Sequence, residues 1–464
     1  MKNRILWKCM VVLFGVLGIV LLLFFSYSNG KAAENEVAYE GELLEENEKA
    51  YYEMEKAKTA GISEEEAETT AAEATAAENS DAQSARMIRV LLMDSDYRQY
   101  TQEKITLIPN GDYTINDGVQ GMLSTGESVE ITGESAYFQD GHMVLKPTDE
   151  NSTVTVTSIT RAQGTPSYSG ILHIYNGDKG MWMVNELPLE TYLAAVVPSE
   201  MPSGYAAEAL KAQAVCARTY AEVQIREKSL EEYYADVDDS VSYQVYQNQP
   251  ATAESIEAVE STKSQILCQN GQPIDAYYFS TSHGKTSTDQ VWEAAVPAAY
   301  LQSVDCAYDQ EEPWYRWQVT FSEEQLLQAV QRVYAQVKHI DRVEITARDE
   351  ADTVIELQIT DGETVYQVNN EYEIRSVLSP QGLTITRQDN TEVTGGALLP
   401  SAYFSIEEQM ENDGTVCYDI RGGGYGHGVG LSQNGAQNMA LDGMTYEEIL
   451  HYFYKDVEIC PQEE

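Results

Sequence analysis

The chain has 464 residues, and its 29 Lys and Arg residues against 75 Asp and Glu residues give a formal net charge of -46 at pH 7. A chain of this length has room for two or more domains with a substantial core. The acidic excess argues against nucleic acid as a partner, because its phosphates would be repelled. We therefore expect a partner that is neutral or that is recognised by a local basic site.

The chain begins with a pattern that predicts a membrane anchor. Lys2, Arg4 and Lys8 precede an uncharged apolar run, and we expect a transmembrane anchor at residues 9–26. Basic residues hold a short N-terminus, here residues 1–8, in the cytoplasm and send the following chain across the membrane. A run of roughly 17 apolar residues is near the lower limit for a span, so a cleaved signal peptide is the alternative. The segment after the run offers only a poor small-residue cleavage site, which favours an uncleaved single-pass anchor in the cell membrane.

Two regions precede the first chemical motif. Residues 27–84 are rich in Glu and Ala, so we expect an acidic, disordered spacer there. Residues 85–171 contain segments such as KITLIP and NSTVTVTSIT, in which β-branched residues alternate with polar ones between turn residues. This pattern predicts mostly antiparallel strands in a β-rich accessory module. The module either binds a ligand or completes the fold of its neighbour.

The most informative segment sets one carboxylate, Glu200, between Pro198 and Pro202. Each proline lacks a backbone N–H and fixes its own φ, so the side chain between them lies on a stiff turn. A carboxyl group that is held in place and partly desolvated suits a catalytic acid. The alternative is that Ser199 and Glu200 cap the helix that follows.

The next segment predicts a regular helix from about residue 206 to residue 226. Small and apolar residues recur at spacings of three and four, which indicates one tightly packed face made of Leu210, Ala214, Ala217 and Ala221. Lys211 and Arg218 are seven residues apart and share a different face, with Gln213 offset around the helix. A basic face is usually only a solvated surface, but basic residues are scarce in this chain.

Residues 314–405 have a second mixed pattern. The segment FSEEQLLQAVQRVYAQV predicts an amphipathic helix, and RVEITA, VIELQI and ETVYQV predict strands. Helices and strands in mixed order are typical of an α+β domain.

Four ordered motifs carry a resemblance to a known family. The run ELPLETYLAAVVPSEMP followed by ALKAQAVCARTYA resembles the signature of the stage II sporulation protein D (SpoIID/LytB) family, which acts on bacterial cell-wall glycan. Three further blocks agree in order: ADVDDSVSYQVY, YYFSTSHGKTSTDQVW and RGGGYGHGVGLSQNGA. The resemblance covers roughly residues 172–454. It implies an extracytoplasmic, SpoIID/LytB-like α+β catalytic domain at residues 172–460.

The resemblance also implies roles for individual residues. Members that act as lytic transglycosylases use the glutamate of the SEMP motif, which is Glu200 in this chain. A basic or polar cleft is implied as well, in which Lys211 and Arg218 would face the lactyl carboxylates of muramic acid. We expect these residues to bind substrate or to support the glutamate: Lys211, Gln213, Arg218, Ser280, Ser282, His283, Tyr425, His427 and Gln433.

The glycine-rich block at residues 421–436 is the second chemical signal. Its glycines leave the backbone open to close approach by a ligand or by another chain segment. It is not a P-loop, because no Lys-Ser or Lys-Thr pair follows. We expect His427 and Gln433 to project toward the cleft, with a hydrogen-bonded structural histidine as an equal alternative for His427. Ser282 and His283 do not predict a serine hydrolase, since they are adjacent and no nucleophile elbow surrounds them.

The six cysteines contain no Cys-x-x-Cys spacing, so neither a zinc site nor a disulfide framework is indicated. Some family members carry zinc on a cysteine pair near the DV...QVY motif, where this sequence has Asp238 and Tyr243. We therefore expect no metal and no cofactor. One cysteine pair outside the membrane could still be oxidised.

A single convincing acid favours a lytic transglycosylase over a glycosidase, which needs a second carboxylate. As the family implies, Glu200 would protonate the bond between N-acetylmuramic acid and N-acetylglucosamine in peptide-free strands and then help to close a 1,6-anhydro ring. We expect this reaction in septal wall remodelling during sporulation engulfment. Because some relatives enhance a wall amidase, the alternative is a non-catalytic, glycan-binding scaffold that recruits or stimulates an amidase of the stage II sporulation machinery. A purely structural spore-coat or wall protein is a third, weaker alternative.

Overall fold

The computed structural model describes most of the chain after the expected spacer. The described residues are 85–95, 97–240, 243–294, 296–410, 414 and 416–462. The expected cytoplasmic N-terminus, membrane anchor and spacer, residues 1–84, lie outside this set. In the described part, no helix combines the length and the apolar character that crossing a membrane requires. The described chain contains both helices and sheets in mixed order, which confirms the α+β class.

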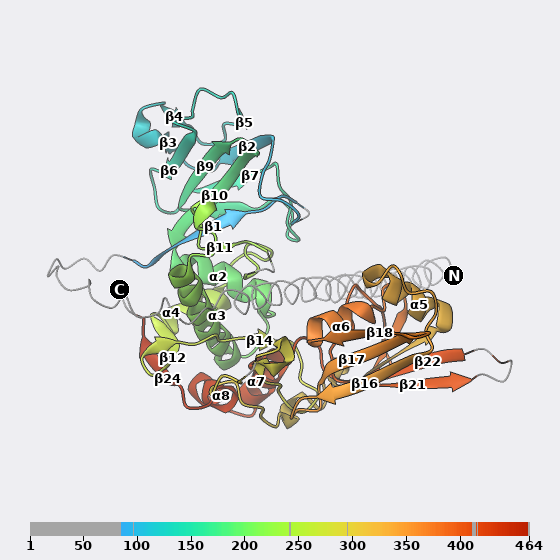
Figure 1. Cartoon of the computed structure of the whole chain (residues 1–464). Helices are drawn as coiled ribbons and strands as arrows, with labels where there is room; N and C mark the ends of the chain where they lie inside the picture. Colours follow the sequence, from blue (N-terminus) through green and yellow to red (C-terminus); the bar gives the residue numbers. More distant parts are fainter. Residues whose placement is uncertain are drawn as a thin grey trace, which may run out of the picture.

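The first part of the described chain forms two β-sheets, drawn in blue to green at the top of Figure 1. The larger sheet has the order β11-β1-β10-β9-β6-β3-β4, and the smaller one has the order β5-β2-β7-β8. Buried and exposed residues alternate along most of these strands, as the sequence pattern predicts. The elements are β1 (Met87–Leu92), β2 (Lys104–Pro109), β3 (Tyr113–Ile115), η1 (Asn116–Gly118), β4 (Met122–Leu123), β5 (Val129–Thr132), β6 (His142–Pro147), β7 (Thr153–Val156), β8 (Ser167–Ser169), β9 (Ile171–Gly177), β10 (Gly180–Pro188) and β11 (Val237–Asp238).

The β-rich part is continuous with the helical part that follows it. Strand β10 pairs with β1, and β11 from after the long helix also pairs with β1. One hydrophobic core extends from Ile88 in the sheets to Val457 near the end of the chain. The expected boundary between residues 171 and 172 therefore falls inside a sheet. Hydrogen bonds between the strands join the expected β-rich module to the expected catalytic domain in one sheet.

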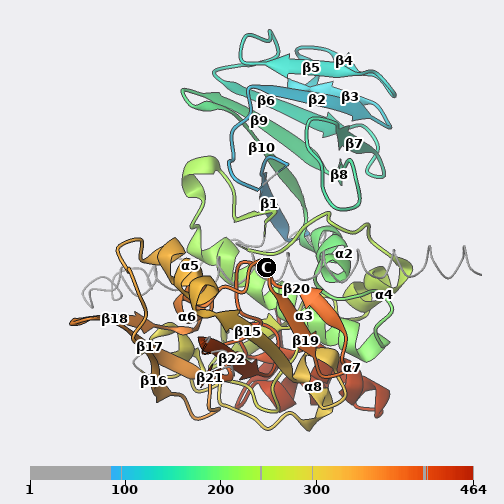
Figure 2. The ribbon, with the colours of Figure 1, turned by 90° about the vertical axis from the view of Figure 1, so that its right-hand side faces the viewer.

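Helices surround α3 (Ala207–Glu227), which matches the predicted helix and is buried along most of its length. Small side chains such as Ala212 and Ala217 let neighbouring elements approach α3 closely. Figure 2 shows this helical layer directly below the two sheets. The remaining elements of this part are α2 (Leu189–Glu200), η2 (Glu231–Tyr233), α4 (Ala253–Ser261), β12 (Gln265–Gln269), β13 (Gln272–Pro273), β14 (Tyr278–Phe279), η3 (Asp289–Trp292), β23 (Leu431–Ser432), α7 (Gln433–Leu441), α8 (Tyr446–Phe453) and β24 (Glu458–Pro461).

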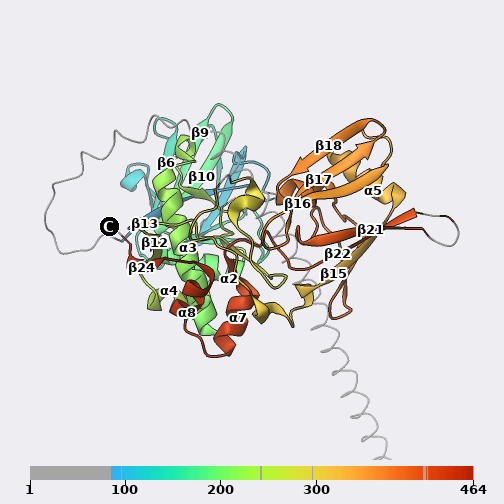
Figure 3. The same cartoon turned by 60° about the horizontal axis from the view of Figure 1, so that its bottom comes forward.

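A second unit with its own hydrophobic core is inserted between β14 and β23. It contains a five-stranded sheet of order β20-β19-β15-β22-β21 and a three-stranded sheet of order β16-β17-β18. Figures 1 and 3 show this unit, in orange and red, to one side of the helices. The predicted amphipathic helix and the three predicted strands of residues 314–405 are all present in it. The helix η4 (Ala307–Asp309) precedes this unit and packs on α7. The elements of the unit are η5 (Pro313–Tyr315), β15 (Trp317–Ser322), α5 (Glu323–Val333), β16 (Arg342–Arg348), β17 (Val354–Asp361), β18 (Thr364–Asn369), α6 (Glu371–Val377), β19 (Thr384–Arg387), β20 (Glu392–Thr394), β21 (Phe404–Met410) and β22 (Val416–Gly422).

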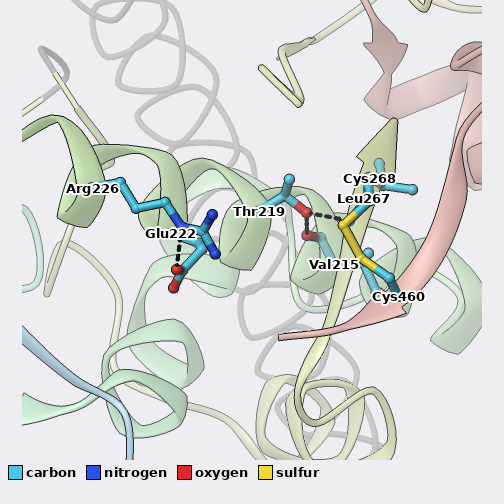
Figure 4. Close-up of a disulfide and its surroundings, with 7 residues drawn as sticks. All are labelled: Val215, Thr219, Glu222, Arg226, Leu267, Cys268 and Cys460. Atoms are coloured by element: carbon cyan, nitrogen blue, oxygen red, sulfur yellow. Dashed lines mark hydrogen bonds and ion pairs between the residues drawn. A yellow bond between two sulfur atoms is a disulfide. The ribbon is translucent and has the colours of Figure 1, made fainter. Parts of the chain in front are cut away.

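A disulfide between Cys268 and Cys460 joins β12 to β24 across 192 residues of sequence (Figure 4). The same corner is tied to α3, because Leu267 N donates to Thr219 Oγ1 at 2.9 Å and that hydroxyl donates to Val215 O at 2.6 Å. The bond thus fastens the C-terminal strand to the long helix. The spacing of the cysteines could not predict which two of them form this disulfide.

Replacing both bonded cysteines by serine is expected to lower the free energy of unfolding by about 2–4 kcal/mol, because the unfolded chain loses a long loop constraint. Urea unfolding of the full-length chain under non-reducing conditions measures the difference. The matched control is Cys417→Ser, which removes a thiol that is not in a disulfide. Equal unfolding midpoints for the double variant and the control would show that the two thiols are not joined.

Candidate active site

Glu200 is the last residue of α2, at the point where the chain leaves the helix. Pro198 lies inside this helix, and Met201 has an extended conformation at φ -136°. The following helix α3 has Ala206 at its N-cap without a side-chain cap. The alternative that Ser199 and Glu200 cap α3 is therefore wrong. The two prolines predict that Glu200 lies on a turn, whereas the structure places Pro198 and Glu200 in the last turn of α2 and ends the helix directly after Glu200.

The Glu200 side chain is half-buried, and its carboxyl group accepts hydrogen bonds. Val245 N donates to Glu200 Oε1 at 2.9 Å. Burial raises the pKa of Glu200 to about 7, although the hydrogen bonds from Val245 and from the Tyr278 hydroxyl oppose the rise. A carboxyl group with this pKa can both give and take a proton near neutral pH.

Tyr278 is oriented toward Glu200 by buried polar side chains. Gln244 Nε2 donates to the Tyr278 hydroxyl oxygen at 3.4 Å and to Ala217 O at 3.2 Å. Tyr192 in turn donates its hydroxyl to Gln244 Oε1 at 3.3 Å. Because the Tyr278 oxygen already accepts a hydrogen bond from Gln244, its own proton is available for the Glu200 carboxylate. Sequence reasoning missed Tyr278 and Gln244, although both lie inside the quoted motifs.

Two predicted residues, Gln213 and Gln433, lie beside Glu200. Gln433 Nε2 donates to the Glu200 carbonyl oxygen at 3.0 Å and lies 3.5 Å from Gln213 Oε1. Gln213 is fully buried, and its Nε2 atom has no hydrogen-bond partner within the described residues. A buried donor without a partner costs free energy.

The two predicted basic residues do not join this group. Lys211 lies two positions from Gln213, which places it on the opposite side of α3, where it pairs with Glu208 at 2.7 Å. Arg218 has no exposed side-chain surface, and its Nη2 lies 2.6 Å from a Glu190 carboxylate oxygen. The rest of its guanidinium donates to carbonyl and hydroxyl oxygens of the surrounding elements. This placement does not fit a glycan contact, because a buried, paired guanidinium is a packing group.

His427 is a hydrogen-bonded structural histidine, which was the alternative prediction for this residue. It is buried, its Nδ1 accepts from Val429 N at 3.1 Å, and its Nε2 lies 3.0 Å from Tyr278 O. Burial lowers the pKa of His427 to about 3, so the ring is neutral and Nε2 donates to that carbonyl. This hydrogen bond from His427 holds the backbone of Tyr278 in place.

The glycine-rich block packs against other chain segments. A Cβ atom on Gly424, whose φ is +85°, would lie 2.9 Å from Thr281 O. One on Gly422 would overlap the Trp317 ring. The sequence predicts that these glycines allow close approach either of a ligand or of another chain segment. At Gly422 and Gly424, the close approach of another chain segment explains the glycine. Tyr425, in the same block, exchanges backbone hydrogen bonds with Thr281 at 3.0 and 2.8 Å and is buried.

The STSHG segment is joined to α7 through a carboxylate that sequence reasoning did not single out. Asp309 accepts from Ser282 N at 2.9 Å and from Ser432 Oγ at 2.9 Å, and burial raises its pKa to about 6. Ser282 Oγ donates to Cys306 O at 3.4 Å. Ser432 caps α7 directly before Gln433.

The two other residues predicted in this segment lie close by. Ser280 Oγ lies 3.2 Å from Thr281 Oγ1, and Ser280 O accepts from Asn434 N at 2.9 Å. The His283 ring stacks on Tyr403 of the inserted unit, with centroids 3.7 Å apart. Among the described residues, no group of three or more His, Cys, Asp or Glu side chains is arranged to hold a metal ion.

Comparison with known proteins identifies the family. A family model described as stage II sporulation protein matches residues 177–268, and a domain of unknown function matches residues 293–430, most of the inserted unit. The chain is 31% identical over 293 residues to stage II sporulation protein D of Bacillus subtilis (strain 168), covering 60% of this chain and 75% of that protein. It is 33% identical over 298 residues to the protein of the same name from Bacillus amyloliquefaciens, with the same 60% and 75% coverage. It is also 30% identical over 294 residues to an amidase enhancer of Bacillus subtilis (strain 168), covering 56% of this chain and 39% of that protein. The chain belongs to the stage II sporulation protein D family.

Proposed function

We propose that this protein is a lytic transglycosylase of the bacterial cell wall that cuts peptide-free glycan strands between N-acetylmuramic acid and N-acetylglucosamine. The observation that carries the proposal is the environment of Glu200. Its carboxyl group has a pKa of about 7, and its described hydrogen bonds come from Val245 and Tyr278. Both partners are hydrogen-bond donors, which hold the carboxyl group in place for proton transfer.

The mechanism uses one carboxyl group twice. Protonated Glu200 gives its proton to the glycosidic oxygen, while positive charge develops at C1 of the muramic acid as the bond breaks. The resulting carboxylate then takes the proton of the C6 hydroxyl, whose oxygen attacks C1 and closes the 1,6-anhydro ring. Tyr278 stabilises the carboxylate between these steps by hydrogen bonding. No water is consumed, and Glu200 ends protonated for the next cycle.

The partial exposure of Glu200 supports the placement of a substrate here. Glu200 is half-buried rather than sealed from solvent, and Gln433 holds its backbone in place. A neutral sugar also suits a chain with a net charge of -46.

The names of the relatives support the cellular setting. Two are stage II sporulation proteins, so we place the activity in wall remodelling during sporulation engulfment. We also propose that residues 9–26 anchor the chain in the cell membrane with the catalytic part outside. The disulfide agrees with this side of the membrane, because such bonds persist in oxidising compartments.

The relative described as an amidase enhancer favours one alternative function. In this alternative, the chain is a scaffold that binds glycan and recruits or stimulates a cell-wall amidase without cutting the strand. The raised pKa of Glu200 argues for chemistry instead, since a binding scaffold has no use for a desolvated acid that costs stability.

Product analysis tests the proposal. The full-length chain is incubated with peptide-free glycan strands, and the fragments are examined by mass spectrometry. We expect fragments that end in 1,6-anhydro-muramic acid and lack the mass of one water relative to hydrolysed ends. Reducing ends would indicate a hydrolase. Uncut strands together with faster turnover by an added amidase would indicate the scaffold.

A further inference from the structure

Cationic and aromatic side chains gather where the inserted unit meets the STSHG segment. We call this group the Arg316 surface, and it consists of Trp314, Tyr315, Arg316, Arg387 and Tyr403. Arg316 Cζ lies 4.1 Å from the centre of the Tyr315 ring and 5.8 Å from that of Tyr403. Arg387 Cζ lies 5.2 Å from the centre of the Trp314 ring. All five residues come from the unit that matches a domain of unknown function.

Arg316 is exposed and is held in one orientation. Its Nη1 atom donates to His283 O at 2.9 Å and to Tyr315 O at 2.6 Å, and its plane lies on the Tyr315 ring. No carboxylate among the described residues pairs with it, although acidic residues outnumber basic ones by 75 to 29 in the chain. The other guanidinium nitrogens are therefore left for a planar, bidentate acceptor.

His283 adds a second polar group beside Arg316. Its ring lies parallel to that of Tyr403 at an angle of 3°, and it is 9% exposed. His283 Nε2 is buried and has no hydrogen-bond partner among the described residues. Burial and the charge of Arg316 lower the pKa of His283 to about 3, so the neutral ring adds no competing charge.

The Arg316 surface is connected to the candidate active site through a short stretch of chain. Trp314 packs on Tyr425 with ring centres 4.5 Å apart, and Tyr425 pairs with Thr281. His283 follows Tyr278, which contacts Glu200, by five residues, and five extended residues span at most roughly 18 Å. This upper limit on the distance between Tyr278 and His283 is comparable to the length of a few sugar units.

We propose that the Arg316 surface binds a carboxylate of a muramic acid unit in the same glycan strand that Glu200 cuts. Arg316 supplies a charged fork for the carboxylate, and the aromatic rings beside it pack against the apolar face of a sugar. In a peptide-free strand the carboxylate is that of the lactyl group; in a strand that keeps its stem peptides the lactyl carboxyl is an amide, and the carboxylate belongs to the peptide. This inference rests on the proposed function and assigns a role to the inserted unit.

The test measures binding without cleavage. Full-length Glu200→Gln protein is compared with the Glu200→Gln, Arg316→Ala double variant on three probes: peptide-free glycan strands, strands that keep stem peptides, and chitin oligosaccharides, which have no carboxylate. We expect the second substitution to weaken binding of muramic acid strands by about 10–100-fold and to leave chitin binding unchanged. Arg316→Lys should recover part of the loss, because it keeps the charge without the fork.

The matched control is Arg342→Ala in the same background, which removes an exposed charge from β16 of the same unit. A loss only on peptide-free strands assigns the lactyl carboxylate, which exists free only where the stem peptide is absent, and a loss only on peptide-bearing strands assigns the stem peptide; losses on both assign a surface that accepts either carboxylate. Equal loss on chitin, or a loss no larger than that of Arg342→Ala, would overturn the proposal. If the Glu200→Gln protein binds these strands but wild type leaves them uncut, the proposed function is wrong. The binding measurement on the Arg316 variants still decides separately whether the Arg316 surface binds a carboxylate.

Discussion

Replacing Glu200 by Gln is expected to lower the rate of glycan cleavage by about 10²–10⁴-fold, because the amide cannot donate a proton to the leaving oxygen. The substitution keeps the volume of the side chain and an acceptor for Val245 N, which lies 2.9 Å from Glu200 Oε1. The variant should therefore stay folded and bind glycan. Release of anhydro-ended fragments from peptide-free strands measures the rate, and circular dichroism checks the fold. An unchanged rate would remove Glu200 from the chemistry.

The pH dependence of wild-type cleavage follows from the same side chain. Burial raises the pKa of Glu200 to about 7, so the proton that starts the reaction is present below that pH and is lost above it. We expect kcat/KM to be level in weak acid and to fall about tenfold per pH unit above pH 7. In Tyr278→Phe a hydrogen bond that favours the carboxylate is gone, so the fall should begin at higher pH. If the pH profile of Tyr278→Phe equals that of wild type, the hydrogen bond between Tyr278 and Glu200 would be contradicted.

The local features of this chain could be predicted from its sequence. Pro198 and Pro202 restrict the backbone on both sides of Glu200, and the alternation of β-branched residues marks the strands. The spacing of small residues predicted helix α3, which runs from Ala207 to Glu227. Each of these signals acts over a few neighbouring residues. The exception among these predictions is Pro198, which lies inside helix α2 although a proline usually restricts a helix.

Features that depend on distant contacts could not be predicted in this way. Lys211 and Arg218 share a helix face, but only the fold places Glu190 against Arg218 and seals it from solvent. The pairing of Cys268 with Cys460 joins segments that have no common pattern. Asp309 stands in an acidic stretch without a motif and acquires its importance from burial. Whether these site residues act as proposed stays a prediction for the experiments above.

Removing the Asp309 carboxylate is expected to destabilise the protein by about 3–5 kcal/mol, because Asp309→Ala leaves buried donors without an acceptor. Ser282 N and Ser432 Oγ both donate to it, and Cys306 Sγ lies 3.3 Å away. Urea unfolding measures the change. The matched control is Asp305→Ala, whose side chain is 85% exposed and which should change stability by less than about 0.5 kcal/mol.

Asp309→Ala should also slow cleavage, although Asp309 does not touch the proposed substrate. Strands β14 and β23 pair in parallel, with Tyr278 opposite Leu431 and Phe279 opposite Ser432, and Figure 1 shows β14 between the helices and the inserted unit. Since Asp309 fastens Ser432 at the start of α7, its loss frees both Tyr278 and Gln433 to move from Glu200. Asp309→Asn keeps one acceptor oxygen and should recover part of the rate. If kcat of folded Asp309→Ala equals that of the control, Asp309 supports the fold alone and has no part in positioning the acid.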